Sequence, residues 1–326
     1  MSAPTTPVSL LNTAQRIIDT QCGQLQVMVS WPLGWSEDGQ PPTGEPVSDV
    51  PVVFVLDGNA YFATATDIVR RLQFAVRKKA VVVGVGYPCM SEAVFSMERR
   101  ALDLTPPTKK SGFPTWQPRP GQGAAAGPGG HGQGQRPQLR YGGAATFQQA
   151  LVDEVLPAVP EMLPALAAVW KDMRKVLFGH SFGGLITLYS LYSRPGVFDT
   201  YVAASPSLWF NDGAIQEHEE TFLQQTGKEM GATKKPRLYI TGGTAEEDLL
   251  PKPGDADAGI FARRQADVKA KKMNENSRAL TERLLLSGLL SEVWLQIFDL
   301  EDHGSSAVVG LQRSINKVLD EWWVRR

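Results

Sequence analysis

The chain has 326 residues, of which 42% are hydrophobic, and it carries a formal net charge of -1 at pH 7. This balance gives no electrostatic basis for binding nucleic acid or an anionic membrane. The two cysteines cannot form a disulfide framework, no Cys/His spacing indicates a metal site, and sparse cysteine usage suits a reducing compartment. The N-terminal residues lack the pattern of a secretion signal, and no apolar run approaches the roughly 20 residues of a membrane span, so a cytoplasmic protein is expected.

Short apolar runs alternate along the chain with helical patterns. The runs at 51–56 and 80–86 are continuous and rich in valine, which is typical of strands buried on both faces, whereas 24–31 alternates like an edge strand. The predicted strands are 24–31, 51–56, 80–86, 175–178, 198–204, 237–241 and 293–298. The predicted helices are 61–76, 144–170 with breaks at its prolines, 185–192, 261–286 and 307–323. This alternation predicts an α/β fold, with a mostly parallel central sheet covered by helices on both faces, as a single domain over residues 1–326.

The segment at about 107–141 differs from its surroundings in composition. It is dominated by glycine, proline and glutamine, which cannot pack a core, and it is too long for an ordinary connection inside a compact domain. We interpret it as a flexible insertion near the mouth of the active site, and a surface loop without a role is the alternative.

A nucleophile elbow is predicted at Ser181. The pattern Gly-x-Ser-x-Gly surrounds this serine, with an apolar strand before it and a helical pattern after it, as such an elbow requires. The turn leaves little room around the serine, and Gly179, Gly183 and Gly184 have no Cβ that could clash. The alternative is a glycine-rich turn with a structural role.

A serine nucleophile needs a base, and histidine is the usual one near neutral pH. The chain has four histidines. We expect the His180 side chain to point away from Ser181, His131 to lie in the glycine-rich insertion, and His218 to be exposed on a helix. His303 follows the last predicted strand and precedes the last helix, where an α/β-hydrolase places its base. It is therefore the predicted base, with a loop histidine at a helix cap as the alternative.

The acid that orients the base should follow the preceding strand, where three carboxylates stand together. Glu246 is the first choice, Glu247 and Asp248 are the competitors, and a Ser–His dyad without an acid is the remaining alternative. Asp302 is too close in sequence to His303 to orient its ring comfortably.

The predicted oxyanion hole consists of main-chain N–H groups. Phe182, directly after the nucleophile, supplies one donor, and Gly58 or Asn59, in the loop after an early strand, supplies the other. The alternative for this Asp-Gly-Asn segment is an ordinary turn. No glycine-rich phosphate-binding pattern follows the first buried strand, so no cofactor is expected.

With these residues placed, the chain resembles the esterase branch of the α/β-hydrolases, most of all the siderophore esterases related to enterobactin and salmochelin esterases and their fungal counterparts that cleave fusarinine-type siderophores. The resemblance covers about residue 20 to the end, apart from the insertion. It is carried by residues 56–60, 83–87, 100–106, 142–144, 153–157, 179–184 and 204–209, together with His303.

The resemblance implies that Ser181 is the nucleophile and His303 the base, while relatives differ on whether a glutamate near Glu246 takes part. It implies that Trp209 lines the substrate pocket, with a core tryptophan as the alternative. Arg100 is a second candidate for substrate binding, although the favoured interpretation is that Arg100 and Asp103 form a pair with a structural role. The insertion departs from the bacterial relatives.

The expected activity is hydrolysis of the ester bonds of an imported ferric hydroxamate siderophore, of the triacetylfusarinine C type, so that iron is released inside the cell. The chemistry needs no protein-bound metal, since the iron belongs to the small-molecule substrate. A general carboxylesterase or acyl-thioester hydrolase is the second hypothesis, and a non-catalytic binding protein on the same fold is the third.

Overall fold

The structure is a computed structural model that describes residues 5, 8–88, 93–108, 139–229, 234–251 and 258–324. The insertion predicted at about 107–141 therefore lies mostly outside the described residues. Its described flanks lie side by side, because the Thr105 hydroxyl accepts a 2.8 Å hydrogen bond from the main-chain N–H of Gly142.

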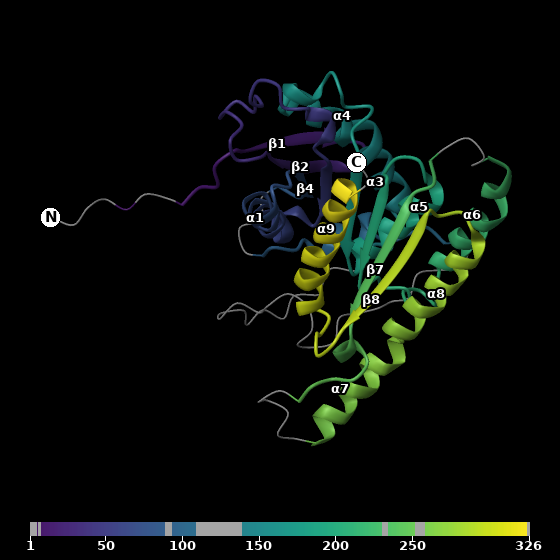
Figure 1. Ribbon diagram of the computed structural model, residues 1–326. Helices are drawn as coiled ribbons and strands as arrows, with labels where there is room; N and C mark the ends of the chain where they lie inside the picture. Colours follow the sequence, from purple (N-terminus) through teal and green to yellow (C-terminus); the bar gives the residue numbers. More distant parts are fainter. Residues whose placement is uncertain are drawn as a thin grey trace.

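One sheet organises the described chain (Figure 1). Its strand order is β1-β2-β4-β3-β5-β6-β7-β8; β2 is antiparallel to both of its neighbours, and all pairs from β4 to β8 are parallel. The strands are β1 (Thr13–Thr20), β2 (Gly23–Ser30), β3 (Val52–Leu56), β4 (Val81–Gly86), β5 (Lys175–His180), β6 (Thr200–Ala204), β7 (Arg237–Gly243) and β8 (Glu292–Phe298). The mostly parallel sheet predicted from the sequence is confirmed.

The helices surround this sheet. They are α1 (Gly58–Val76), α2 (Met97–Asp103), α3 (Ala144–Ala150), α4 (Leu156–Met162), α5 (Phe182–Ser193), α6 (Ile215–Glu229), α7 (Ala258–Lys271), α8 (Met273–Ser287) and α9 (Ser305–Val324). A π-helical turn, η2 (Leu151–Val155), joins α3 to α4, and the short 3-10 turns are η1 (Val47–Asp49), η3 (Pro164–Leu166) and η5 (Thr244–Glu246).

Three of the predictions about individual elements were wrong. The strand predicted as an edge is β2, an inner strand, because β1 pairs with its outer side. The helix predicted at 261–286 is two helices, since Lys272 has left-handed backbone angles (φ 48°) that end α7 before α8 begins. The helical stretch predicted at 144–170 runs through Pro157 and Pro160 without the expected breaks, and it ends at Met162, close to the break expected at Pro164 and short of residue 170.

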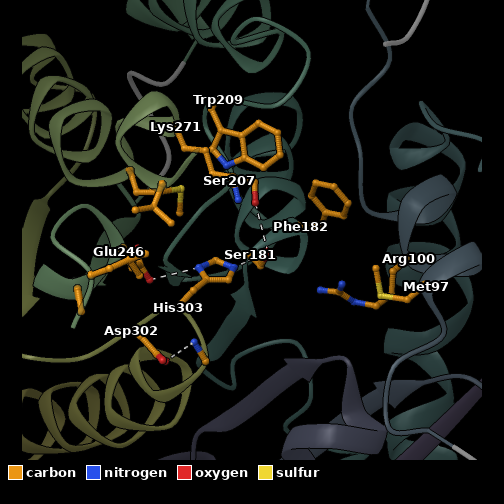
Figure 2. Close-up of a pocket in the computed structure, with 15 residues that line it drawn as sticks. Met97, Arg100, Ser181, Phe182, Ser207, Trp209, Glu246, Lys271, Asp302 and His303 are labelled. Atoms are coloured by element: carbon orange, nitrogen blue, oxygen red, sulfur yellow. Dashed lines mark hydrogen bonds and ion pairs between the residues drawn. The ribbon is translucent and has the colours of Figure 1, made fainter. Parts of the chain in front are cut away.

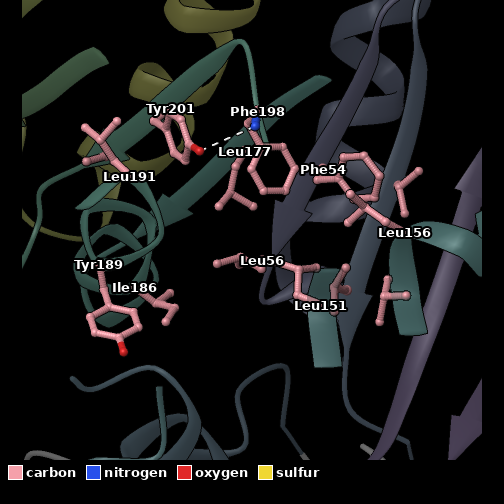
Figure 3. Close-up of a cluster of buried hydrophobic side chains, with 14 of the residues drawn as sticks. Phe54, Leu56, Leu151, Leu156, Leu177, Ile186, Tyr189, Leu191, Phe198 and Tyr201 are labelled. Atoms are coloured by element: carbon pink, nitrogen blue, oxygen red, sulfur yellow. Dashed lines mark hydrogen bonds between the residues drawn. The ribbon is translucent and has the colours of Figure 1, made fainter. Parts of the chain in front are cut away.

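Both faces of the sheet are apolar because both are covered. Along β3, Val53 and Val55 belong to the hydrophobic cluster beneath α1 and α9. The alternate residues Phe54 and Leu56 belong to the larger cluster on the other face, which includes Ile186 of α5 (Figure 3). This is why β3 reads as an unbroken apolar run rather than as an alternating one.

The carboxyl ends of the parallel strands share one edge of the sheet, so the loops after β3, β5, β7 and β8 meet there. In open α/β sheets this edge is where ligands bind. Within the described residues, no helix combines the length and the apolar character needed to cross a membrane.

Candidate active site

Ser181 stands at a sharp turn between β5 and α5. Its backbone is strained (φ 61°, ψ -115°), and its N–H is held by Ala204 O at 3.0 Å. A Cβ at Gly179 would lie 2.0 Å from Gly183 O, so only glycine fits there. The predicted strand, elbow and helix are therefore present, and they place Ser181 just beyond the carboxyl end of β5.

The structure brings Ser181, His303 and Glu246 together (Figure 2). His303, on the loop between β8 and α9, places Nε2 3.0 Å from Ser181 Oγ. Its Nδ1 lies 3.3 Å from Oε1 of Glu246, which η5 positions after β7. The Glu246 side chain is buried, whereas that of His303 is 47% exposed, so the histidine lies at the boundary between the core and the pocket.

The two neighbouring carboxylates lie elsewhere. Glu247 Oε1 accepts the main-chain N–H groups of Asn274 and Glu275, at 2.6 and 3.0 Å, in the first turn of α8. Asp248 is 80% exposed, and its carboxylate lies 3.7 Å from Lys269 Nζ. Of the three candidates left open by the sequence, Glu246 is the one that contacts His303.

Serine hydroxyls support this arrangement, and sequence reasoning missed them. Ser306 Oγ donates to Glu246 Oε1 at 2.9 Å, and Ser205 Oγ lies 2.8 Å from Ser306 Oγ. Ser207 Oγ lies 3.2 Å from Ser181 Oγ. Ser205 and Ser207 fall in the segment 204–209 that carried part of the resemblance, whereas no pattern singled out Ser306.

The sequence analysis expected the His180 side chain to point away from Ser181, and this expectation is wrong. The His180 ring lies against that of His303, with centroids 4.6 Å apart, and its Nδ1 lies 3.2 Å from the Tyr61 hydroxyl. Burial, followed by the nearby His303 and Arg100, holds the pKa of His180 well below its ordinary value. His180 is therefore neutral at physiological pH.

The other two histidines lie away from Ser181 or outside the described residues. His218 is half-buried rather than exposed: its Nε2 lies 2.8 Å from Pro107 O, and its ring contacts Tyr189. His131 lies outside the described residues.

The residues expected to supply the oxyanion donors differ in their position relative to the pocket. Phe182 lines the pocket and begins α5 directly after Ser181. Gly58 and Asn59 begin α1 after β3, the parallel neighbour of β5, and are not among the described residues that line the pocket. The Asn59 amide is bound to both main-chain groups of Tyr87, at 2.8 and 2.9 Å, which fixes the start of α1.

A pocket of about 480 Å³ opens beside Ser181. Trp209 forms part of its wall, with Lys271 Nζ 5.0 Å from the centre of the indole ring. Met97, Leu249, Val268 and Met273 contribute apolar surface. Such a mixture of hydrophobic walls and a few charged groups is usual for a small-molecule site.

Arg100 also lines this pocket, but its ion pair differs from the expected one. Its Nε donates to Asp57 Oδ1 at 2.6 Å, and both side chains are buried. Asp103, the expected partner, is paired instead with Arg99 at 3.0 Å. In Figure 2 the Arg100 guanidinium points into the pocket toward Ser181, so its pairing with Asp57 also orients it there.

The parallel sheet, the elbow and the loop histidine define an α/β-hydrolase, and comparisons with known proteins agree. The family model described as "Putative esterase" matches residues 125–281. The siderophore hydrolases EstA and EstB from Aspergillus nidulans both superpose with a TM-score of 0.81, at 32% and 30% identity, covering 99% and 98% of this chain and 99% of each of theirs.

Curated relatives point the same way. A siderophore enterobactin esterase from Emericella nidulans is 34% identical over 307 residues, or 93% of this chain and 92% of that protein. A siderophore triacetylfusarinine C esterase from Aspergillus fumigatus is 30% identical over 97% of this chain and 96% of that protein. The chain therefore belongs to the siderophore-esterase family of serine hydrolases and is an ester hydrolase. A general carboxylesterase and a non-catalytic binding protein are not favoured.

Proposed function

We propose that this protein hydrolyses the ester bonds of a ferric hydroxamate siderophore of the triacetylfusarinine C type. The observation that carries the proposal is the hydrogen-bonded series Ser181–His303–Glu246 at the mouth of a pocket of about 480 Å³. The relative from Aspergillus fumigatus, which spans nearly the whole chain, supports the choice of substrate.

In this mechanism Ser181 Oγ attacks the ester carbonyl carbon while His303 Nε2 accepts the hydroxyl proton. Glu246, facing Nδ1, holds the imidazole in orientation and stabilises its positive charge. The buried carboxylate can do this because Ser306 binds the same oxygen and fixes its position. The series therefore acts as nucleophile, base and orienting acid.

The tetrahedral oxyanion is stabilised by the Phe182 N–H and by a main-chain N–H of Gly58 or Asn59. Collapse of the intermediate breaks the bond to the alcohol oxygen, which takes the proton from His303. Water, deprotonated by the same imidazole, then attacks the acyl-serine; the acyl–Oγ bond breaks, the proton returns from His303 to Ser181 Oγ, and the acid is released. These steps use only side chains and main-chain groups of this chain, and the iron remains part of the substrate.

Trp209 and Arg100 are proposed as substrate contacts. Trp209 offers an extended aromatic surface suited to a large, compact ferric complex, and Arg100 directs buried N–H groups into the pocket. The formal net charge of -1 suits an uncharged ferric hydroxamate. We place the reaction in the cytoplasm after siderophore uptake, in keeping with the free thiol of Cys22.

A ferric catecholate is the second candidate substrate, and a specific observation favours it. The relative from Emericella nidulans is a siderophore enterobactin esterase.

Steady-state hydrolysis of three esters by the purified protein distinguishes these possibilities. Ferric triacetylfusarinine C, ferric enterobactin and p-nitrophenyl acetate are compared by kcat/KM, with products followed by chromatography and mass spectrometry. The proposal expects the hydroxamate to be the best substrate. A preference for ferric enterobactin would favour the second candidate, and turnover of p-nitrophenyl acetate alone would reject both.

A further inference from the structure

Ser181 lines two cavities in the part of the chain that the structure describes. The first is the pocket of about 480 Å³ described above, which we call the Trp209 pocket. The second, which we call the Phe95 pocket, has a volume of about 460 Å³ and is lined by Ala60, Tyr61, Val94, Phe95, Met97, Arg100, His180, Ser181, His303 and Gly304. The two cavities share the lining residues Met97, Arg100, Ser181, His303 and Gly304. Ser181 and His303 therefore lie where the cavities meet.

The chemical character of the two cavities differs. Glu246, Asp302 and Lys271 line the Trp209 pocket alone. The Phe95 pocket is lined mainly by hydrocarbon and aromatic groups. Among its described lining residues, Arg100 is the one with a side chain of the acidic, lysine or arginine type.

The polar groups of the Phe95 pocket are largely engaged with the protein. The Tyr61 hydroxyl is hydrogen-bonded to His180, which burial holds neutral. Arg100 is paired with Asp57, and its guanidinium lies over the Phe95 ring at 5.1 Å from the centroid. Tyr61 and Phe95 in turn pack edge to face, with centroids 5.8 Å apart. The cavity therefore presents a preformed apolar surface with few polar groups free to recognise a charged ligand.

An ester carbonyl carries two substituents, the acyl chain and the alkoxy group. When Ser181 attacks the carbonyl carbon, the two substituents extend from this carbon in different directions. The two cavities provide two such directions. We propose that the Phe95 pocket binds an uncharged hydrocarbon substituent of the scissile ester, while the Trp209 pocket holds the larger, polar remainder. This rests on Ser181 as the nucleophile of the proposed function, and not on a siderophore as the substrate.

Filling the cavity tests the proposal. Val94 is 54% exposed at the cavity wall, so Val94→Trp narrows the cavity without disturbing the core. Val76→Trp is the matched control, because Val76 is 47% exposed at the end of α1 and lines neither cavity. Phe95→Leu is the converse variant, which enlarges the cavity. Thermal melting verifies that each variant is folded.

The substrates are simple esters in two arms. The acyl arm compares p-nitrophenyl hexanoate with p-nitrophenyl acetate, and the alcohol arm compares hexyl acetate with methyl acetate by proton release. A misfit of one or more methylenes changes kcat/KM by roughly 10-fold or more. Val94→Trp should therefore lower the long-to-short ratio of kcat/KM by about 10-fold in one arm, which identifies the substituent bound. Phe95→Leu should raise the ratio in the same arm, and Val76→Trp should change it by less than about two-fold.

An unchanged ratio in both arms of Val94→Trp, or an equal loss on all four esters, would overturn the proposal. Because siderophores are not used, a failure of the protein to cleave siderophores would leave this test unaffected.

Discussion

The imidazole of His180 lies against that of His303, with ring centroids 4.6 Å apart and planes inclined by 42°. His180 ends β5, and Tyr61 of α1 holds its Nδ1 from behind. The half-exposed His303 thus rests on a buried neutral ring that is fixed by the core. We infer that His180 acts as a positioning residue that limits the orientations of His303 without accepting the proton itself.

His180 should make the free energy of unfolding depend on pH. Its folded-state pKa is lowered, so below its ordinary value of 6.5 the unfolded chain binds a proton that the folded protein does not. Stability should therefore fall as pH decreases below about 6.5, by at most about 1.4 kcal/mol per pH unit from this group. In His180→Asn, whose amide can still meet the Tyr61 hydroxyl, this part of the pH dependence should vanish. Urea denaturation at pH 7.5 and 5.5 measures it, and equal pH dependence in both proteins would argue against a neutral His180.

Glu246→Gln should lower kcat strongly while leaving the fold intact. The amide has the shape of the carboxylate but cannot stabilise the His303 imidazolium, and loss of an orienting acid costs up to about 10⁴ in kcat in a well-ordered triad. We expect a loss of at least about 10² with p-nitrophenyl acetate. Glu247→Gln is the control, because the adjacent carboxylate binds the first turn of α8 instead. If Glu246→Gln loses as little activity as the control, the enzyme works as a Ser–His dyad.

The difference between what the sequence predicted and what it missed has a physical origin. The strands around Phe54 and Val83 could be predicted because both of their faces are buried, which gives continuous apolar runs. The Ser181 elbow could be predicted because the turn requires glycines within five residues. β1 was missed because most of its side chains are exposed, so its sequence lacks a buried face even though it pairs along its length with β2. The approach of Glu246 to His303, and of His180 to the same ring, depends on how separate loops meet at the sheet edge. Local sequence does not contain that information.

The buried ion pair of Arg100 and Asp57 should matter for stability. Arg100→Met removes the cation and leaves the Asp57 carboxylate buried with an unpaired charge, which typically costs about 3–5 kcal/mol. Arg71→Met is the comparison, because Arg71 and Asp67 form an exposed pair one helical turn apart, of the kind worth at most about 1 kcal/mol. Chemical denaturation of both variants measures the difference. Similar small losses in both variants would contradict a stabilising role for the buried pair.

Trp209 is expected to affect large substrates more than small ones. Trp209→Leu keeps an apolar side chain but removes the aromatic surface and the contact with Lys271. Loss of apolar contact equivalent to one buried methylene costs about 0.8 kcal/mol, so KM for the ferric siderophore should rise by roughly 4-fold or more. The effect on p-nitrophenyl acetate, which is too small to span the pocket, should be weaker. An equal effect on both substrates would indicate that Trp209 supports the fold and does not contact the siderophore.

The most direct test of this account is siderophore cleavage by the wild-type protein and by Ser181→Ala under the same conditions. Ferric triacetylfusarinine C is incubated with each, and the products are separated by chromatography and identified by mass. We predict linear ester fragments with the wild-type protein and a rate lower by at least about 10³ with Ser181→Ala, whose melting temperature should be unchanged. Siderophore cleavage that persists in Ser181→Ala, or no cleavage by the wild-type protein, would contradict the account.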